Sequence, residues 1–171
     1  MIEVASLAAL AFILSIALKS EKMLLSEKIN ELHKKVDPSI GEELKIESVK
    51  QVVDLIKTIR YEPEVIDRVS NPRELLNRGY GDCEDFAVLT YSLLEHLGLN
   101  PKFAIAYNEE DPEAHAFVFY KCQYNCNTYY IFSNRDFFKA SSVEEAAKML
   151  GYSNVIYEKP ETIKLAVNQE A

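Results

Sequence analysis

Three polar segments in the second half of the chain have residue types and an order that suit nucleophilic chemistry. Cys83 stands where a glycine-containing turn gives way to a helix pattern. His115 lies in the β-rich run 114–119, and a second β-rich run, 128–132, ends in Ser133-Asn134-Arg135-Asp136. A cysteine at a helix start, a histidine on a strand and a polar residue after the next strand match a thiol nucleophile, its base and the group that orients the base.

The segment that follows Cys83 has the spacing of an amphipathic helix with one buried face. Its apolar residues recur at three- and four-residue steps: Phe86, Leu89, Leu93 and Leu97. Asp82 is a suitable N-cap with Asp85 three residues later, and Gly98 is a suitable C-cap. Cys83 is therefore expected in the first helical turn, where unpaired N–H groups favour a thiolate and could bind an oxyanion.

Neighbouring carboxylates oppose ionisation of this thiol. Asp82, Glu84 and Asp85 surround Cys83 in the sequence, and nearby negative charges raise a thiol pKa. We expect the conflict to be eased where Glu84 and Asp85 point away from the sulfur, or where an imidazolium faces it. The acidic helix start and the Gly-Tyr-Gly approach favour a functional cysteine over a small buried core residue.

The run Gly81-Asp82-Cys83-Glu84-Asp85-Phe86-Ala87, followed by an apolar helix ending in Leu97-Gly98-Leu99, resembles the transglutaminase-like superfamily. It is most similar to the bacterial and archaeal transglutaminase-like cysteine peptidases. The resemblance covers residues 49–157. It implies that Cys83 is the nucleophile, that His115 is the base, and that an aspartate or asparagine on the following strand completes the site.

The third position departs from the family pattern, because Ser133 stands where aspartate is usual. Ser133, Asn134 and Asp136 are all candidates. Asn134 is the predicted member, since an asparagine can accept the imidazole N–H, as in papain-like sites. Tyr80 and Asn77 are candidate oxyanion donors, although Tyr80 is expected to be a packing residue in a turn.

The other two cysteines, Cys122 and Cys126, flank an expected hairpin turn. No second cysteine pair or histidine cluster in the sequence completes a tetrahedral zinc site, so we predict no metal and no cofactor. Across a tight hairpin the two cysteines could form a disulfide, and two reduced thiols are the equal alternative. Either way Cys83 is the odd cysteine, which suits a free reactive thiol.

The N-terminus carries an uncharged run of 15 residues from Val4 to Leu18. A membrane span usually needs about 20 apolar residues, and the acidic start does not fit a signal peptide. We predict an uncleaved membrane anchor over residues 1–20, with a buried helix and a signal peptide as alternatives. Lys19, Lys22 and Lys28 on its C-terminal side favour a cytoplasmic-facing domain, whereas a disulfide in the hairpin would favour the opposite side.

A helical stalk or linker is predicted over residues 21–40. Its apolar residues form a narrow seam that could mediate self-association or pack on the domain: Leu25, Ile29, Leu32 and Val36. A transglutaminase-like domain over residues 41–158 and a C-terminal tail over 159–171 complete the predicted organisation. Helical patterns precede β-rich runs, which predicts an α+β fold with N-terminal helices packed on a small antiparallel sheet.

Composition bounds the function. The 171-residue chain has 48% hydrophobic residues, enough for one domain with a core, and its net charge of −8 argues against a nucleic-acid surface. With the resemblance, these residues predict thiol-dependent acyl transfer on peptide or carboxamide bonds of a peptide or protein substrate. The alternatives are a transglutaminase or transpeptidase that uses an amine acceptor, and an inactive peptide-binding or scaffold domain at a membrane.

Overall fold

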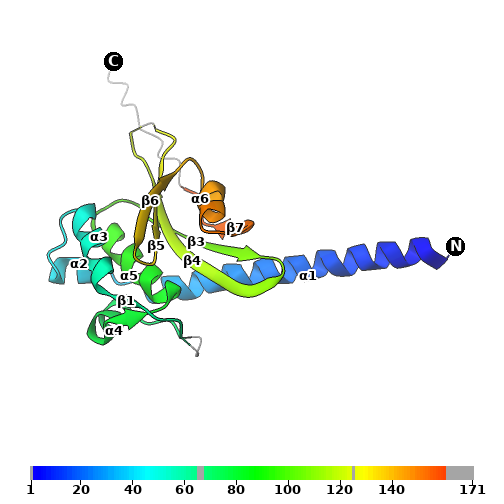
Figure 1. The fold of residues 1–171 in the computed structure, drawn as a ribbon, viewed down its shortest axis with the longest axis horizontal. Coiled ribbons are helices and arrows are strands. Elements are labelled where there is room, and N and C mark those ends of the chain that lie inside the picture. The colour runs from blue at the N-terminus through cyan, green and yellow to red at the C-terminus, as the bar shows by residue number, and fades with distance from the viewer. Residues whose placement is uncertain (1, 65–67, 125, 161–171) are drawn as a thin grey trace, which may run out of the picture.

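The protein is described by a computed structural model over residues 2–64, 68–124 and 126–160. Most helices precede the main sheet along the chain (Figure 1). The elements are α1 (Ile2–His33), α2 (Ser39–Glu43), α3 (Val49–Thr58), β1 (Arg60–Tyr61), α4 (Pro72–Arg78), β2 (Tyr80–Gly81), α5 (Cys83–His96), β3 (Lys102–Asn108), β4 (Asp111–Lys121), β5 (Tyr129–Ser133), β6 (Asp136–Ala140), α6 (Val143–Met149) and β7 (Asn154–Tyr157).

The main sheet has five antiparallel strands in the order β6-β5-β4-β3-β7. Side chains on β4 alternate between two apolar clusters, because successive residues of a strand point to opposite faces. Ala116 and Val118 join the cluster formed with α1, α3 and α5, whereas Phe117 and Phe119 join the cluster formed with α6. The predicted α+β class, with the cysteine helix packed on a small antiparallel sheet, is confirmed.

Helix α5 lies at the centre of the larger cluster. Its residues 85–94 are all buried, so the helix is covered on every side rather than on the single face that its spacing predicts. The extra cover comes from α2, α3 and α4 as well as from β4. Polar residues within it are satisfied locally, since the Ser92 hydroxyl donates to the Val88 carbonyl and accepts from the Asp37 N–H. A helix held this firmly gives its first residue a fixed position.

Helix α1 runs without a break through both the predicted anchor and the predicted stalk. Its C-terminal end belongs to the folded body, where Ile29 and Leu32 are buried and Leu25 and Val36 pack against the same cluster. The four residues of the predicted seam therefore pack on their own chain, Ile29 and Leu32 fully and Leu25 and Val36 in part.

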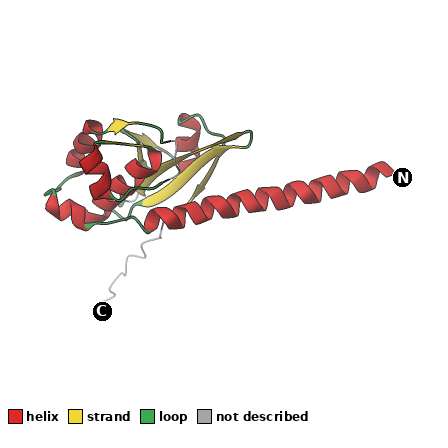
Figure 2. Cartoon of the chain, turned by 90° about the horizontal axis from the view of Figure 1, so that it is seen from below, coloured by secondary structure: helices red, strands yellow, loops and turns green. Residues whose placement is uncertain are grey.

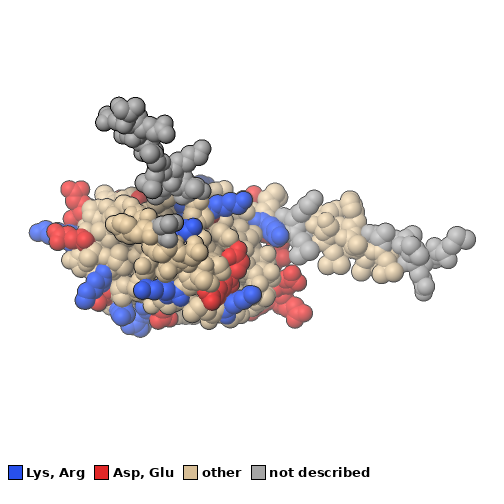
Figure 3. All heavy atoms as spheres, turned by 90° about the horizontal axis from the view of Figure 1, so that it is seen from above, with Lys and Arg blue, Asp and Glu red and all other residues tan. Residues whose placement is uncertain are grey.

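The N-terminal half of α1 extends beyond the body (Figures 1 and 2). Large apolar side chains on it are exposed: Leu7, Leu10, Phe12, Ile13, Leu14 and Ile16. Figure 3 shows acidic and basic residues interspersed over one face of the body, whereas the described part of the projecting segment carries none. Within the described part of the chain, no helix combines the length and apolar content required to cross a membrane.

A second, two-stranded sheet lies beside the start of α5. Strands β1 and β2 run parallel, with Arg60 opposite Tyr80 and Tyr61 opposite Gly81. The α4 helix between them begins at an Asn71 cap with proline in its first turn, and it ends at Gly79 with a left-handed φ of 76°. This short pairing fixes the chain immediately before Cys83 and brings Tyr61 toward the same place.

Candidate active site

Cys83 is the first residue of α5, and its position follows from the cap that precedes it. The Asp82 carboxylate accepts hydrogen bonds from the N–H groups of Glu84 and Asp85, while the Asp85 side chain accepts from the Asp82 N–H. This is the reciprocal capping arrangement expected from the sequence. The sulfur of Cys83 interacts with the N–H of Ala116 on β4. The thiol thus lies against the strand residue that follows His115.

His115 is held from the opposite side by Ser133. The imidazole Nε2 and the Ser133 hydroxyl oxygen are 2.7 Å apart, with His115 only 9% exposed and Ser133 only 4% exposed. Ser133 is the last residue of β5, the strand next to β4 in the sheet. The third position of the candidate site is therefore filled by a hydroxyl group.

Asn134, the predicted third member, does not contact His115 in the part of the chain that the structure describes. It stands in the turn between β5 and β6 with a φ of 52°, and its side-chain oxygen is buried without a hydrogen-bond partner. Asp136 pairs across the same turn with Ser133 and is exposed at the start of β6. Of the three candidates, Ser133 is the one with a hydrogen bond to the imidazole among the described residues.

Two tyrosines complete the surroundings, and sequence reasoning had not placed either of them there. The Tyr152 ring stacks on His115 with centroids 5.8 Å apart and planes 7° apart. Tyr61 and Tyr152 both interact electrostatically with Cys83. Burial raises the pKa of both phenols, so both remain neutral at physiological pH. No local motif marks Tyr152, since it reaches the site only through the pairing of β7 with β3.

The two candidate oxyanion side chains lie differently. The Tyr80 ring packs between guanidinium groups, 5.4 Å from that of Arg60 and 4.9 Å from that of Arg78. This is the packing role that its turn position predicts. Asn77 is an exposed residue of α4. The N–H groups of Glu84 and Asp85 already bond to Asp82, so the backbone candidate for binding an oxyanion at the start of α5 is the N–H of Cys83 itself.

In the resting structure the thiol and the imidazole both have pKa values that keep them neutral. Burial raises the pKa of Cys83 to about 12, and the charges of Asp82 and Glu84 add to this effect. Burial also lowers the pKa of His115 to about 4. Desolvation thus outweighs the favourable helix terminus, and a preformed thiolate–imidazolium pair is not the resting state.

The acidic residues around Cys83 are compensated by cations from other elements. Arg78 donates to Asp85 at 2.8 Å and pairs with Glu64 at 2.8 Å. Asp85 is fully enclosed and also accepts from the Ser70 N–H. Ligand oxygens of Glu64, Asp82 and Asp85 lie within 4.8 Å of one another, which is close enough to hold a cation. The Arg78 guanidinium already supplies positive charge to two of these three carboxylates.

Residues 12–143 match the family described as the Transglutaminase-like domain. The chain belongs to this family.

The chain also resembles solved structures over part of its length. Calcium-bound LapG from Legionella pneumophila is 23% identical, over 70% of this chain and 78% of LapG, with a TM-score of 0.48. A proposed cysteine protease from Cytophaga hutchinsonii is 18% identical, over 77% of this chain and 53% of that one, with a TM-score of 0.48. No curated protein matches the chain significantly.

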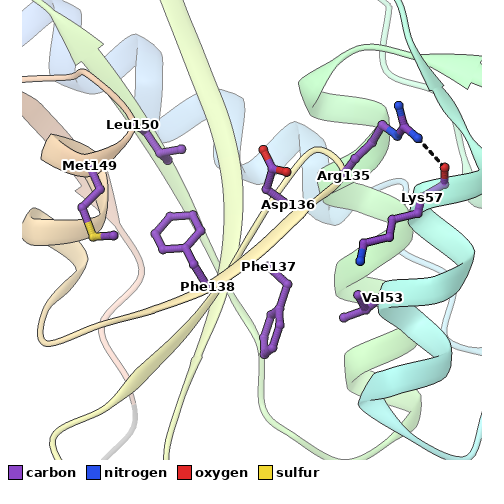
Figure 4. A pocket seen from close by; sticks show the side chains of 8 residues that line it. All are labelled: Val53, Lys57, Arg135, Asp136, Phe137, Phe138, Met149 and Leu150. Carbon is purple, nitrogen blue, oxygen red and sulfur yellow. Dashed lines mark hydrogen bonds between the residues drawn. The ribbon is translucent and has the colours of Figure 1, made fainter.

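Two further features of this transglutaminase-like chain lie away from the thiol. Cys122 and Cys126 form a disulfide across the end of the β4–β5 hairpin, with Cα atoms 5.8 Å apart, and Cys83 is free. A hollow of about 410 Å³ lies between α3, β6 and α6 (Figure 4). It is lined by Val53, Lys57, Arg135, Asp136, Phe137, Phe138, Met149 and Leu150. Cys83, His115 and Ser133 are not among these lining residues.

Proposed function

We propose that the protein catalyses thiol-dependent acyl transfer on peptide or carboxamide bonds. Cys83 acts as the nucleophile, His115 as the general base and acid, and Ser133 as the residue that orients the imidazole. One observation carries the proposal: Cys83 begins the helix that packs on β4, its sulfur faces the backbone of Ala116, the residue after His115, and Ser133 holds the buried His115 at 2.7 Å. Membership of the transglutaminase-like family supports it.

The proposed reaction follows from the neutral resting state. The reaction uses the tautomer in which the Nε2–H of His115 donates to the Ser133 hydroxyl, because Nδ1 is then left to accept a proton. As Cys83 attacks the substrate carbonyl carbon, its proton moves to Nδ1, and the N–H of Cys83 at the start of α5 binds the oxyanion. The imidazolium then protonates the leaving amine as the C–N bond breaks. Water, deprotonated by His115, attacks the thioester and regenerates the thiol.

An amine in place of water would make the same site a transglutaminase or transpeptidase, because the acyl-enzyme is common to both reactions. Hydrolysis is our first proposal. The two outcomes separate when a protein substrate is incubated with the enzyme and a fluorescent primary amine. New fragments indicate hydrolysis, and amine incorporated into intact protein indicates transfer.

A second candidate function is an inactive domain that binds peptides. Two observations favour it: the pKa of Cys83 is raised to about 12, and a hydroxyl stands where the family usually has a carboxylate. Such a domain would use the cleft around Cys83 for recognition only. It would not form a covalent adduct that depends on His115.

Labelling with peptidyl vinyl sulfones tests the proposal. These electrophiles need a thiolate and a proton donor, so a Cys–His pair reacts with them far faster than an isolated thiol does. We expect intact-mass analysis to show one adduct on the full chain, absent in Cys83→Ser and strongly reduced in His115→Ala. Equal labelling of the native chain and His115→Ala, or no labelling across a broad peptide panel, would contradict the proposed enzyme activity. The peptide-binding domain would then be the better proposal.

A further inference from the structure

An ion pair joins helix α1 to the start of the cysteine helix. Lys28 Nζ lies 3.0 Å from Glu84 Oε1, and the two side chains are only 19% and 17% exposed. Lys28 stands one residue before Ile29, which is buried in the core, so the docking of α1 fixes where its ammonium group lies. Glu84 is the residue directly after Cys83. A cation from the N-terminal helix therefore reaches the first turn of α5.

The three carboxylates at this helix start have different partners. Asp82 is engaged by helix N–H groups, and Asp85 is bound by Arg78 and by the Ser70 N–H. Glu84 is the other carboxylate whose charge acts on Cys83, and Lys28 is a cationic partner of it. Without that cation, the negative charge next to the thiol would be less compensated and would oppose ionisation of the sulfur more strongly.

We propose that Lys28 is a positioning residue for the reaction of Cys83, which makes α1 a working part of the site. It acts through Glu84, holding and neutralising that carboxylate so that the thiol can ionise during attack. The inference rests on the proposed function, because it concerns the nucleophile assigned there. It also implies that the C-terminal end of α1 cannot be removed without a change in Cys83 chemistry.

Between pH 7 and pH 9 the charges of the other groups described around Cys83 stay constant. Tyr61 from β1 and Tyr152 near β7 have raised pKa values and stay neutral there. His115 on β4, with its pKa lowered to about 4, is neutral as well. Asp82 is ionised throughout this range and is unchanged between variants. Lys28 also lies 3.9 Å from the exposed Glu31 of its own helix, but Glu84 is its partner that adjoins Cys83.

The experiment measures alkylation of Cys83 by iodoacetamide in the full chain at several pH values between 7 and 9. The disulfide keeps Cys122 and Cys126 from reacting. Lys28→Met is expected to slow alkylation roughly 3- to 10-fold at each pH, which corresponds to a pKa rise of about half to one unit. Lys28→Arg should retain the native rate, and Lys34→Met, at an exposed position of the chain near the end of α1, should leave it unchanged.

A double-mutant cycle separates the charge effect from loosened packing. Glu84→Gln should speed alkylation, and Lys28→Met should then have no further effect in the Glu84→Gln background. If Lys28→Met slows or speeds alkylation equally in both backgrounds, or has no effect in the native one, the proposed role is wrong. The vinyl sulfone assay tests the enzyme separately. If labelling depends on His115 but the Lys28 and Glu84 substitutions show no coupling, only the role of Lys28 is contradicted. If the coupling is found but labelling does not depend on His115, only the proposed enzyme activity is contradicted.

Discussion

Replacing Ser133 by aspartate should convert the neutral imidazole of this site into an imidazolium near neutral pH. Ser133 already lies 2.7 Å from Nε2 of His115, and both residues are buried, so a carboxylate there would meet the ring N–H directly. The substitution would restore the residue type that is usual for the family at this position. It changes one side chain without touching the nucleophile or the base.

The magnitude follows from Coulomb's law. Opposite charges about 4 Å apart attract by about 4 kcal/mol at the effective dielectric constant of a protein site, which corresponds to about three pKa units. Burial of the new carboxylate offsets part of this gain. We therefore expect the pKa of His115, about 4 in the native chain, to rise to roughly 6–7 in Ser133→Asp.

The assay is a titration of the histidine ring signals by NMR in the native chain, Ser133→Asp and Ser133→Asn. His33 and His96 serve as internal references, and Ser133→Asn matches the size of aspartate without its charge. A His115 that still titrates below pH 5 in Ser133→Asp would refute the reasoning. So would an equal rise in Ser133→Asn, because the shift would then come from altered packing rather than from charge.

Two further predictions concern stability. Between pH 6.5 and about 4 the unfolded chain binds a proton at His115 that the folded chain does not. Stability should therefore fall as pH falls through this range, by about 3 kcal/mol in full. His115→Asn should lose correspondingly less between pH 7 and 4.5 in urea titrations, and equal losses would contradict the assignment. Arg78→Met should cost about 3 kcal/mol, because it strips the partner from buried Asp85. The control Arg60→Met removes an exposed ion pair and should cost under about 1 kcal/mol, so similar losses would contradict the role of Arg78.

The sequence alone predicted the parts of the site that depend on local chemistry. The Asp82 cap, the glycine after the helix and the apolar spacing place Cys83 at a helix start, and the structure has all three features. The transglutaminase-like resemblance also predicted the fold, which the family match confirms. These features lie within a short stretch of chain, where spacing and residue type determine the conformation.

The prediction of Asn134 as the third site residue missed the turn in which this residue lies. The polar run after β5 was interpreted as a site segment, whereas it forms a tight turn into β6, a strand that was not predicted. Asparagine tolerates a positive φ better than most residues, so Asn134 serves the turn. The aromatic pair Phe137 and Phe138 was the available signal for the missed strand.

The contacts that compensate the charges around Cys83 could not be predicted from the sequence, for a different reason. Lys28, Arg78 and Tyr152 come from α1, α4 and the approach to β7, and they reach Cys83 or its neighbours only in the folded chain. Their spacing in the sequence follows no local period. The seam of α1 was correctly seen as apolar, yet its role inside the domain depended on a docking surface that other elements build.

The structure also explains how three carboxylates can flank a nucleophilic thiol. The Asp82 carboxylate accepts hydrogen bonds from helix N–H groups, Glu84 is paired with Lys28, and Asp85 is paired with Arg78. What then opposes ionisation of Cys83 is chiefly burial. A bound substrate would exclude still more water, so ionisation has to accompany attack rather than precede it. A neutral Ser133 suits that sequence of events, because it orients a neutral imidazole without stabilising the charged form before the substrate arrives.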